Sequence, residues 1–431
     1  MIIRINFNYF FWRFIVSLQK ALPKDGRLQL SAFSFAILAI SAVQTASAGI
    51  NETIENVLKF GQDDTKYGQI KFDLRYRYEQ DDTKNPAKDH ADASTFRMRL
   101  GYLTPEFYGL QGYAEYEMNQ DIIENNYNST RNGKGSYEVI ADPQEHELNQ
   151  LWLSYKGISD TEIKVGRQRI KIDNDRFIGN VGWRQLEMTY DAVLITNKSL
   201  PNTTVKVGYI NQAQTIKSTV TPMQTPFFNI SYKLNGLGKI TGYGYLIDNN
   251  EAHAKSNQTY GVSFDGKATI SADVKALYRL EYAYQKDYEQ NPNSYNVDYY
   301  HLIGGVNLYG ITLKGGMEEL GGKGTGRAFQ TPLATGHAFN GWADQFLATP
   351  GDGLRDVYGL VTGKVMGVKL MGVYHAFDDD SGSKSYGNEY DFLAVKKFGK
   401  HYSLLAKYAY FNGSNGRFDS QNFWLQAGVN F

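Results

Sequence analysis

Apolar and polar residues alternate with a period of two along most of this chain. In the segment 70–79, IKFDLRYRYE, every second residue is aliphatic or aromatic, and each residue between them is charged. The same alternation returns at 96–102 (FRMRLGY), 274–284 (VKALYRLEYAY), 402–410 (YSLLAKYAY) and in the last nine residues, FWLQAGVNF. Because successive side chains of a strand point to opposite faces, each segment is predicted to be a strand with one apolar face.

The length of these strands favours a membrane barrel over a soluble β-sandwich or propeller, which also show alternation. Strands of soluble sheets are typically about five or six residues long. Strands that cross an outer membrane have about ten residues, with aromatic residues near their ends. The chain contains 32 Tyr and 24 Phe, and they cluster at the ends of the predicted strands. After Val43 no apolar run is long enough for a spanning helix, so a membrane-embedded chain must cross as a closed barrel.

The connections between the predicted strands alternate between short and long. Short turns include TPEFYG (104–109), KGISD (156–160), NGLG (235–238) and VMG (365–367). Long polar segments lie near 119–145, 211–225, 248–257, 285–297, 319–354, 378–388 and 412–420. Short periplasmic turns and longer outer loops are typical of outer-membrane barrels. The alternation predicts an all-β fold, a transmembrane antiparallel β-barrel of about 18 strands, with both mature termini on the periplasmic side.

The N-terminal region has the features of a secretory signal. An apolar run, AFSFAILAISAV (32–43), follows several basic residues and precedes the small-residue cleavage site Ala46-Ser47-Ala48. The run is shorter than the roughly 20 residues of a spanning helix, although a short anchor helix is an alternative. We predict a signal peptide at 1–48, a periplasmic leader at 49–66 and the barrel at 67–431. Helical spacing of apolar residues in the leader indicates a short periplasmic helix; a disordered leader is the alternative.

The chain ends on an aromatic residue, Phe431. In a closed barrel the last strand pairs with the first, which fixes the C-terminus. A terminal alternating strand that ends in Phe also resembles the C-terminal signature of bacterial outer-membrane proteins. The resemblance implies that Phe431 is an assembly signal, read by the barrel-assembly machinery.

The charged face of the first three strands is predicted to line the lumen. This face carries Arg75, Arg77, Arg97, Arg99, Glu115 and Glu117. Adjacent strands lie about 4.8 Å apart, so the arginines form a basic column beside an acidic one. We predict a weak anion preference that is lost as ionic strength rises. The alternative is that these charges only pair with one another, at about 0–1 kcal/mol for each pair.

Three further segments carry a family resemblance. They are ELNQLWLSYKG (147–157), TEIKVGRQRIKIDNDRFIGNVGWRQ (161–185) and RAFQTPLATGHAFNGWADQFLATPGDGLRDVYGLV (327–361). They resemble the alginate-export-type porin family, which consists of monomeric outer-membrane barrels of about 18 strands, many of unknown cargo. The resemblance implies an arginine-lined anion path, to which Arg167, Arg169, Arg176 and Arg184 would add.

The segment 319–354 is far longer than a typical loop, and such loops are usually functional. Its aromatic residues are unexpected in a solvated loop. We predict that it folds inward, with HAFNGWADQFL (337–347) as a short helix or turn against the barrel wall, and narrows the pore. The residues of this predicted constriction are Phe329, His337, Phe339, Trp342, Asp344 and Phe346. An outer flap or a lipopolysaccharide contact is the alternative.

Other chemical motifs are weak. The chain has no Cys, which excludes thiol catalysis and Cys metal sites. GGKGTG (321–326) lacks the ending and the helix of a phosphate loop and is interpreted as a loop hinge. DDDSGSKSYGNE (378–389) places its glycine wrongly for a calcium loop and is interpreted as a solvated outer loop. We predict no catalytic site, no metal site and no cofactor, and the absence of basic excess argues against a nucleic-acid partner.

Together these features predict an outer-membrane porin of a Gram-negative bacterium. It would pass small hydrophilic, anionic solutes by passive diffusion, as a monomer in contact with outer-membrane lipid and lipopolysaccharide. One alternative is export of an alginate-like anionic saccharide. Another is a plugged barrel with a structural or adhesive role.

Overall fold

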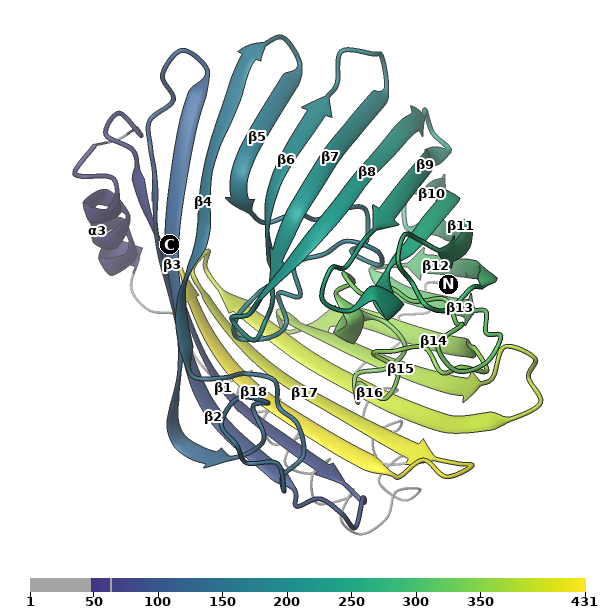
Figure 1. Cartoon of the computed structure of the whole chain (residues 1–431). Coiled ribbons are helices and arrows are strands. Elements are labelled where there is room, and N and C mark those ends of the chain that lie inside the picture. Colours follow the sequence, from purple (N-terminus) through teal and green to yellow (C-terminus); the bar gives the residue numbers. More distant parts are fainter. Residues whose placement is uncertain (1–47, 63) are drawn as a thin grey trace, which may run out of the picture.

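The strands of this chain form one antiparallel sheet that closes into an 18-stranded barrel (Figure 1). The computed structural model describes residues 48–62 and 64–431. The strands are β1 (Gln69–Thr83), β2 (Ala91–Leu103), β3 (Leu110–Asn126), β4 (Glu145–Ile158), β5 (Thr161–Gln168), β6 (Thr189–Asn197), β7 (Thr203–Gln214), β8 (Val220–Leu234), β9 (Gly238–Ile247), β10 (Asn257–Ser271), β11 (Val274–Asp287), β12 (Asn296–Leu308), β13 (Ile311–Leu320), β14 (Leu354–Val365), β15 (Val368–Asp378), β16 (Ser385–Phe398), β17 (Tyr402–Gly413) and β18 (Ser420–Asn430). The predicted fold class is confirmed.

The last strand closes the barrel against the first. β1 and β18 are antiparallel, with Leu74 opposite Val429 and Arg77 opposite Gln426. Beyond β18, the Phe431 amide donates to the Phe72 carbonyl at 2.8 Å, and the Phe72 amide donates back at 3.1 Å. The C-terminus is therefore held by a ladder rather than free to fray, as the terminal alternation predicted.

The connections at one end of the barrel are short turns, and those at the other end are generally longer. Residues 159–160, 272–273 and 366–367 are two-residue turns, whereas 127–144, 169–188 and 321–353 are long loops. β3 extends to Asn126, so the loop predicted to begin near 119 begins later. The loop at 169–188 was not among the predicted long segments.

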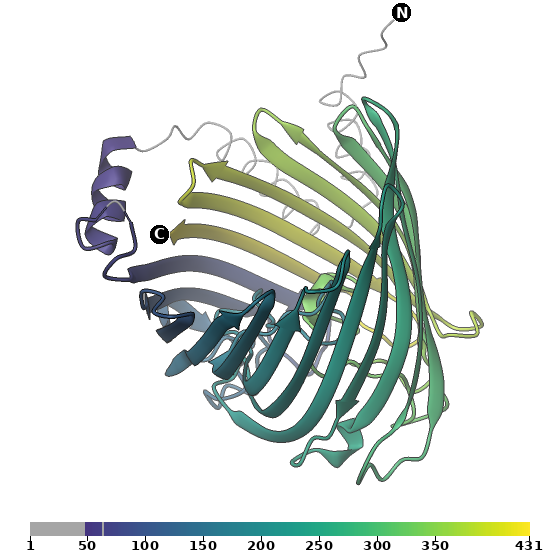
Figure 2. The same ribbon diagram turned by 90° about the horizontal axis from the view of Figure 1, so that it is seen from above.

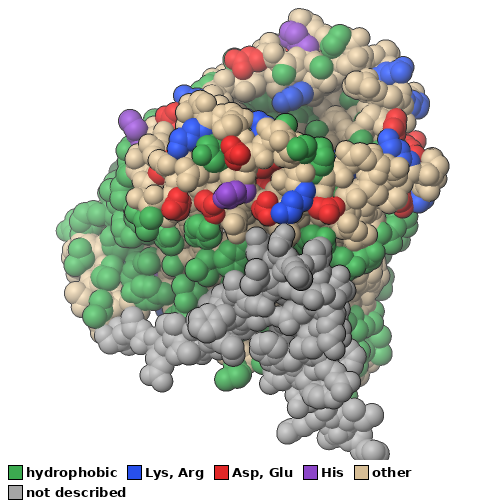
Figure 3. Space-filling model, turned by 90° about the horizontal axis from the view of Figure 1, so that it is seen from below, with side chains coloured by type: hydrophobic (Ala, Val, Ile, Leu, Met, Phe, Trp, Pro, Cys, Tyr) green, Lys and Arg blue, Asp and Glu red, His purple; other side chains and the backbone are tan. Residues whose placement is uncertain are grey.

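Each strand has one apolar face and one polar face. Leu100, Leu153 and Leu280 are exposed on the outer wall, whereas Arg77 and Glu117 are buried inside. Figure 3 shows hydrophobic side chains over the side of the barrel and charged side chains gathered toward one end. This is the arrangement of a barrel whose outer wall faces lipid and whose interior is polar.

A short helix, α3 (Ala48–Leu58), precedes the barrel and lies beside its wall in two views (Figures 1 and 2). The Glu55 carboxylate lies 2.7 Å from His401 Nε2, and the Tyr402 hydroxyl donates to Asn51 at 2.8 Å. The leader is therefore helical rather than disordered where it is described. The helix includes Ala48, the last residue of the predicted signal peptide, whose other residues lie outside the described part.

Within residues 48–62 and 64–431, no helix is long and apolar enough to cross a membrane. Besides α3, the helical elements described there are two single 3₁₀ turns, η1 (His253–Lys255) and η2 (Gly336–Ala338). η2 belongs to the segment predicted to be a short helix or turn.

Candidate functional site

Two long loops fold into the barrel and meet there. We call residues 169–188 the first inward loop and residues 321–353 the second inward loop. Their backbones bond directly: the Gly179 amide donates to the Leu333 carbonyl at 2.9 Å, and the Thr335 amide donates to the Asp175 carbonyl at 3.0 Å. Figure 2 shows segments of chain inside the ring of strands. The lumen is therefore crossed by a two-loop unit rather than lined only by strands.

Aromatic rings pack the two loops against the wall. The Phe177 ring of the first loop lies 5.2 Å from Tyr243 of β9 and 6.1 Å from Phe329 of the second loop. Phe329 in turn stacks on Tyr299 of β12 at 5.1 Å. All four side chains are nearly or completely buried. Burying this apolar surface stabilises the inward position of both loops.

The first inward loop is held to β1 by two of the predicted lumen arginines. Arg75 Nη1 donates to the carbonyls of Gly182 and Trp183, both at 3.2 Å, and to that of Arg184 at 3.1 Å. Arg77 Nη2 donates to the Trp183 carbonyl at 2.6 Å, and its guanidinium lies 4.1 Å from the centre of the Trp183 ring. These arginines thus face the interior but contact the loop rather than open water.

The other predicted arginines of this region pair with carboxylates. Arg97 binds Asp73, and Arg99 binds Glu117. Arg184 of the first inward loop lies 2.7 Å from Glu79 and 3.6 Å from Asp142. The basic column is therefore largely neutralised by acidic partners on neighbouring strands and loops.

Glu187 is the centre of a second ion-pair cluster. Its carboxylate accepts from Arg169 Nε at 2.7 Å, from Asn149 at 2.7 Å and from Asn180 at 2.6 Å. Burial alone would raise the pKa of Glu187, but the charges of Arg99 and Arg169 dominate and lower it to about 2. The same Arg169 lies 3.3 Å from Glu115. The cluster fixes both ends of the first loop to β3 and β4.

The second inward loop binds the opposite side of the barrel. Glu389 of β16 accepts the Ala343 amide at 2.8 Å and also the Trp342 amide. Asn340 donates to Glu318 of β13 at 2.7 Å. Arg176 of the first loop binds the same Glu318 at 2.6 Å. The acidic residues of this wall therefore hold both loops.

Lys407 of β17 joins the wall to both loops at one point. Its Nζ lies 3.8 Å from the centre of the Trp342 ring, 4.2 Å from Trp183 and 5.3 Å from Trp424. It also lies 2.5 Å from His337 Nε2. A cation enclosed by aromatic faces gains cation–π attraction, which is larger when water is excluded.

The protonation of His337 follows from its two partners. Lys407 can only donate, so His337 Nε2 accepts and His337 Nδ1 carries the proton, which it donates to Asp344 at 2.8 Å. Burial, with the charges of Lys407, Arg184 and Arg77, lowers the pKa of His337 well below its ordinary value. Burial raises the pKa of Asp344 to about 6, against the opposing charges of Arg184 and Lys407. His337 is therefore neutral at pH 7.

A vestibule opens above this junction, at the long-loop end of the barrel. It has a volume of about 870 Å³. Its floor is formed by Arg184, His337, Asp344 and Trp424, and charged residues of the outer loops line its sides, among them Glu138 and Arg417. The vestibule is lined by both charged and apolar side chains, is open to the outside and is large enough for one small ligand.

One predicted lumen residue lies elsewhere. Arg167 is opposite Leu151 of β4 and Asp191 of β6, and Leu151 is exposed on the outer wall. Because cross-strand partners share a face, Arg167 is on the outer face, where it binds Asp191 at 2.7 Å. Its assignment to the lumen, which the family resemblance implied, is corrected: the alternation of β5 places Arg167 on the outer face.

The remaining predicted residues lie in or against the second inward loop. Phe346 packs on Phe377 of β15 at 4.5 Å, and Phe339 lies 4.8 Å from the Arg176 guanidinium. At the other end of the barrel, Phe431 stacks on His401 at 4.1 Å. These positions are compatible with the predicted constriction and the predicted assembly signal.

Sequence reasoning missed the first inward loop and Lys407. The signal for the loop was available: KIDNDRFIGNVGWRQ (171–185) breaks the period-two pattern and contains turn-forming Asp, Asn and Gly. No local signal marks Lys407, because its neighbours in sequence form an ordinary strand. Its cage is built from Trp183, Trp342 and Trp424, which are far apart in sequence.

The two weak motifs have structural roles. In GGKGTG, the Gly322 amide donates to Asp380 at 2.8 Å and the Gly324 amide donates to the Gly351 carbonyl at 2.9 Å, which closes the base of the second inward loop. Asp379 accepts the amides of Ser383 and Lys384, at 2.8 and 3.1 Å. It therefore caps its own turn. Among the described residues, no group of three or more acidic or His side chains could hold a metal ion.

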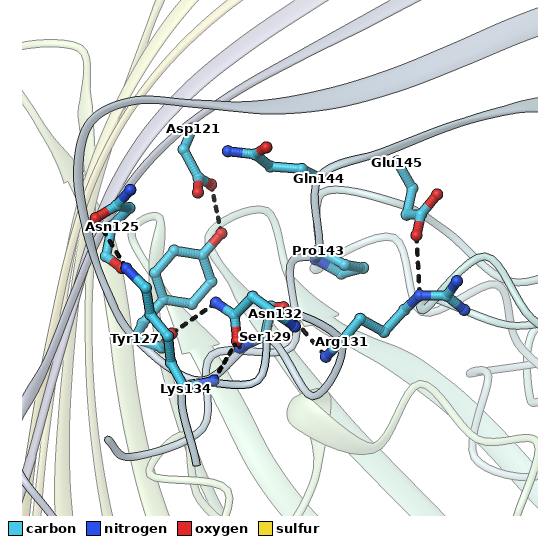
Figure 4. Close-up of a pocket in the computed structure, with 10 residues that line it drawn as sticks. All are labelled: Asp121, Asn125, Tyr127, Ser129, Arg131, Asn132, Lys134, Pro143, Gln144 and Glu145. Carbon is cyan, nitrogen blue, oxygen red and sulfur yellow. Dashed lines mark hydrogen bonds and ion pairs between the residues drawn. The ribbon is translucent and has the colours of Figure 1, made fainter. Parts of the chain in front are cut away.

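The outer loop 127–144 encloses a smaller polar pocket (Figure 4). Tyr127 donates to Asp121 at 2.5 Å, Asn132 donates to the Tyr127 carbonyl at 2.8 Å, and Arg131 binds Glu145 at 2.9 Å. These polar groups bond one another, so the pocket orders the loop.

A closed 18-stranded barrel with an apolar outer wall and a charged, loop-narrowed interior is an outer-membrane barrel of the porin class. The alginate export family matches residues 66–310, which is more than half of the chain. The chain belongs to the alginate export family.

Solved structures show the same fold at low sequence identity. The outer membrane protein OpdK of Pseudomonas aeruginosa superposes with a TM-score of 0.66 at 11% identity, covering 84% of this chain and 99% of its own. OccAB3 of Acinetobacter baumannii gives 0.68 at 12%, and a BenF-like porin of Pseudomonas fluorescens Pf-5 gives 0.67 at 15%, each with the same coverage. Another OpdK structure contains vanillate. No curated protein matches this chain in sequence.

Proposed function

We propose that this protein is an outer-membrane channel that passes small hydrophilic, anionic solutes by passive diffusion. The observation that carries the proposal is the pair of inward loops. They narrow the lumen below a vestibule of about 870 Å³ whose lining includes several charged residues, and this volume is in the range of small-molecule sites. Selectivity would be set by the charges and the width of this constriction.

The preference for anions is supported by two arginines that lack a carboxylate partner. Among the described residues, Arg75 forms no ion pair with an acid and donates to carbonyl oxygens instead. Arg417 of the vestibule lies 4.5 Å from the Phe346 ring and 4.7 Å from the Tyr386 ring, again without an ion pair in the described part of the chain. Both carry a positive charge that no described carboxylate pairs with, and this charge makes the electrostatic potential of the interior more favourable for a passing anion.

Export of an alginate-like saccharide is the second candidate, because the chain belongs to the alginate export family. The loop contacts argue against it. A polymer must thread the whole lumen, whereas the first inward loop is bound to β1 by Arg75 and to β13 by Arg176. A threaded polymer would have to displace this unit, and a single small solute would not.

Liposome swelling tests the proposal. Purified protein in liposomes would be assayed with neutral sugars, amino acids, monomeric uronates and small aromatic acids, and with an alginate oligomer of about ten residues. We expect swelling with the small solutes, fastest with the monovalent acids, and none with the oligomer. Swelling with the oligomer would favour polysaccharide export, and no swelling with no conductance in a planar bilayer would favour a plugged structural barrel.

The zero-current potential in a salt gradient tests the charge preference. Arg75→Gln removes a charge without leaving an unpaired acid, so the weak anion preference should fall. Lys286→Gln, at an exposed lysine near the end of β11, also removes one charge without leaving an unpaired acid and is the control, which should leave the preference unchanged. A cation preference in the wild type would overturn the anionic part of the proposal. Monomeric assembly, insertion by the barrel-assembly machinery and contact with lipopolysaccharide remain part of the proposal, and a non-enzymatic role is consistent with the family.

A further inference from the structure

Lysine side chains gather inside the barrel at its short-turn end. We define the lysine collar as Lys206 of β7, Lys233 of β8, Lys239 of β9, Lys314 of β13, Lys364 of β14 and Lys369 of β15. Both ends of the barrel domain lie at this end, which is the periplasmic mouth in outer-membrane barrels. The collar is separate from the constriction and the outer vestibule.

Contacts with the inward loops show that three of the six strands present this face to the lumen. Lys239 Nζ binds Asp173 of the first inward loop at 2.8 Å. Asn229, the cross-strand partner of Lys206, donates to the same Asp173 at 2.8 Å. On β13, Lys314 shares its face with Glu318, which holds Arg176.

The other three collar residues follow from register. Lys233 is directly opposite Lys239, and Lys369 is directly opposite Lys364. Lys364 shares its face with Asp356 of the same strand, which lies 3.3 Å from Asn340 of the second inward loop. Cross-strand partners share a face, so all six lysines face the lumen rather than lipid. Attraction to lipid headgroups therefore does not explain them.

The collar carries a charge that the fold does not balance. Among the described residues, Lys239 pairs with Asp173 and the other five form no ion pair with a carboxylate. Directly opposite like charges destabilise a sheet, and the collar contains two such pairs, each at a periplasmic hairpin. The arrangement costs stability, and only the Lys239–Asp173 pair offsets part of that cost through an ion pair among the described residues, which indicates a role in binding.

We propose that the lysine collar captures multiply charged anions at the periplasmic mouth of the channel. The Cβ atoms of directly opposite residues lie about 5 Å apart, so the two flexible ammonium groups of a lysine pair can both contact a molecule with two or more carboxylates or phosphates. Like charges around a narrow mouth add their potentials and raise the local concentration of anions. If the protein is a channel, as proposed above, such anions enter it from the periplasmic side more readily than from outside. This consequence, unlike the binding itself, rests on the proposed function.

The binding itself is measured without conductance. Trigalacturonate and inositol hexakisphosphate would be titrated by calorimetry into detergent-solubilised full chain. The ring variant replaces Lys233, Lys239, Lys364 and Lys369 with Gln. We expect it to bind at least about tenfold more weakly, because four exposed charges are lost. The matched control replaces Lys88, Lys134, Lys217 and Lys286 with Gln, which removes the same charge outside the collar and should bind as the wild type.

Sidedness is measured in planar bilayers. The chain has no Cys, so Asn250→Cys in an outer loop, labelled with an impermeant biotin reagent and streptavidin, reports the orientation of each inserted channel. For the matched control, we expect either probe to block current from the periplasmic side at about a tenth of the concentration that blocks it from the outer side. For the ring variant, we expect no difference between the two sides. Binding of only one probe would assign the collar to carboxylates or to phosphates.

The outcomes separate the two proposals. Undiminished binding by the ring variant, or equal block of current from both sides, would overturn the proposal that the lysine collar captures anions. Specific binding by a protein that does not conduct would support the proposal of anion capture by the lysine collar and would overturn the proposal of passive diffusion. The substitutions relieve two like-charge pairs and remove one ion pair, Lys239 with Asp173, whose carboxylate still accepts from Asn229. Unchanged heat modifiability on a detergent gel checks that the ring variant folds.

Discussion

Lys407 Nζ donates a hydrogen bond to His337 Nε2 across 2.5 Å, and this bond joins the barrel wall to the second inward loop. The same ammonium lies 4.2 Å from the Trp183 ring of the first inward loop. One side chain therefore contacts all three parts that meet at the constriction. The contact also excludes water from a cation, which makes its loss costly.

Lys407→Met should loosen the constriction, since methionine keeps the length of the side chain but removes the charge and the donor. We expect a larger and noisier single-channel conductance, and a barrel less stable by about 1–3 kcal/mol because buried acceptors lose their partner. Single-channel recording and the gel-shift temperature measure the two effects. Lys286→Met, on an exposed lysine, is the control. Wild-type conductance in Lys407→Met would show that this contact does not hold the loops.

Deletion of Gly324 to Pro350 should raise single-channel conductance, because it removes most of the second inward loop. The Gly324 amide bonds the Gly351 carbonyl, so the chain leaves and re-enters at nearly the same point and a short closure is feasible. The double variant Trp342→Ala with Phe346→Ala keeps the chain length and should show a smaller rise. Deletion of 130–135 from the outer loop is the control. Normal assembly with unchanged conductance would contradict a constriction role.

Glu187→Gln should remove part of the acid sensitivity of the barrel. The folded-state pKa of Glu187 is lowered from 4.5 to about 2, so its carboxylate stabilises the fold above pH 4.5, and this contribution is lost as pH falls toward 2. Near pH 7 we expect the variant to be less stable by about 3 kcal/mol, because Arg169 and Arg99 lose a partner. The difference from wild type, followed by gel-shift temperature, should shrink between pH 4.5 and 2. A constant difference would show that Glu187 does not titrate in this range.

Phe431→Ser should lower the amount of protein assembled in the outer membrane. The substitution keeps the backbone bonds of residue 431 with Phe72 and removes only the ring contact with His401, so refolding in detergent should change much less than assembly in cells. Phe418→Ser, at an exposed outer-loop position, is the control for loss of an aromatic residue. Equal losses in cells and in detergent would indicate a purely structural role.

The sequence by itself determined the barrel. Period-two alternation indicates which side chains face lipid, and it is visible within a single strand. The faces of the strands around 70–79 and 402–410 were therefore assigned correctly. The short turns and the closing strand followed for the same reason. These are local properties, set by residues that are neighbours in the chain.

The interior was decided by tertiary structure. Arg75 was predicted to face water, yet it binds three carbonyls of a loop more than a hundred positions away. Arg167, which the family resemblance placed in the lumen, lies on the outer face. Lys407 and its three tryptophans come from two strands and two loops, so no local pattern contains them. Alternation specifies only the face of a residue. Which partner meets it inside depends on barrel closure and loop packing, because these bring distant segments together.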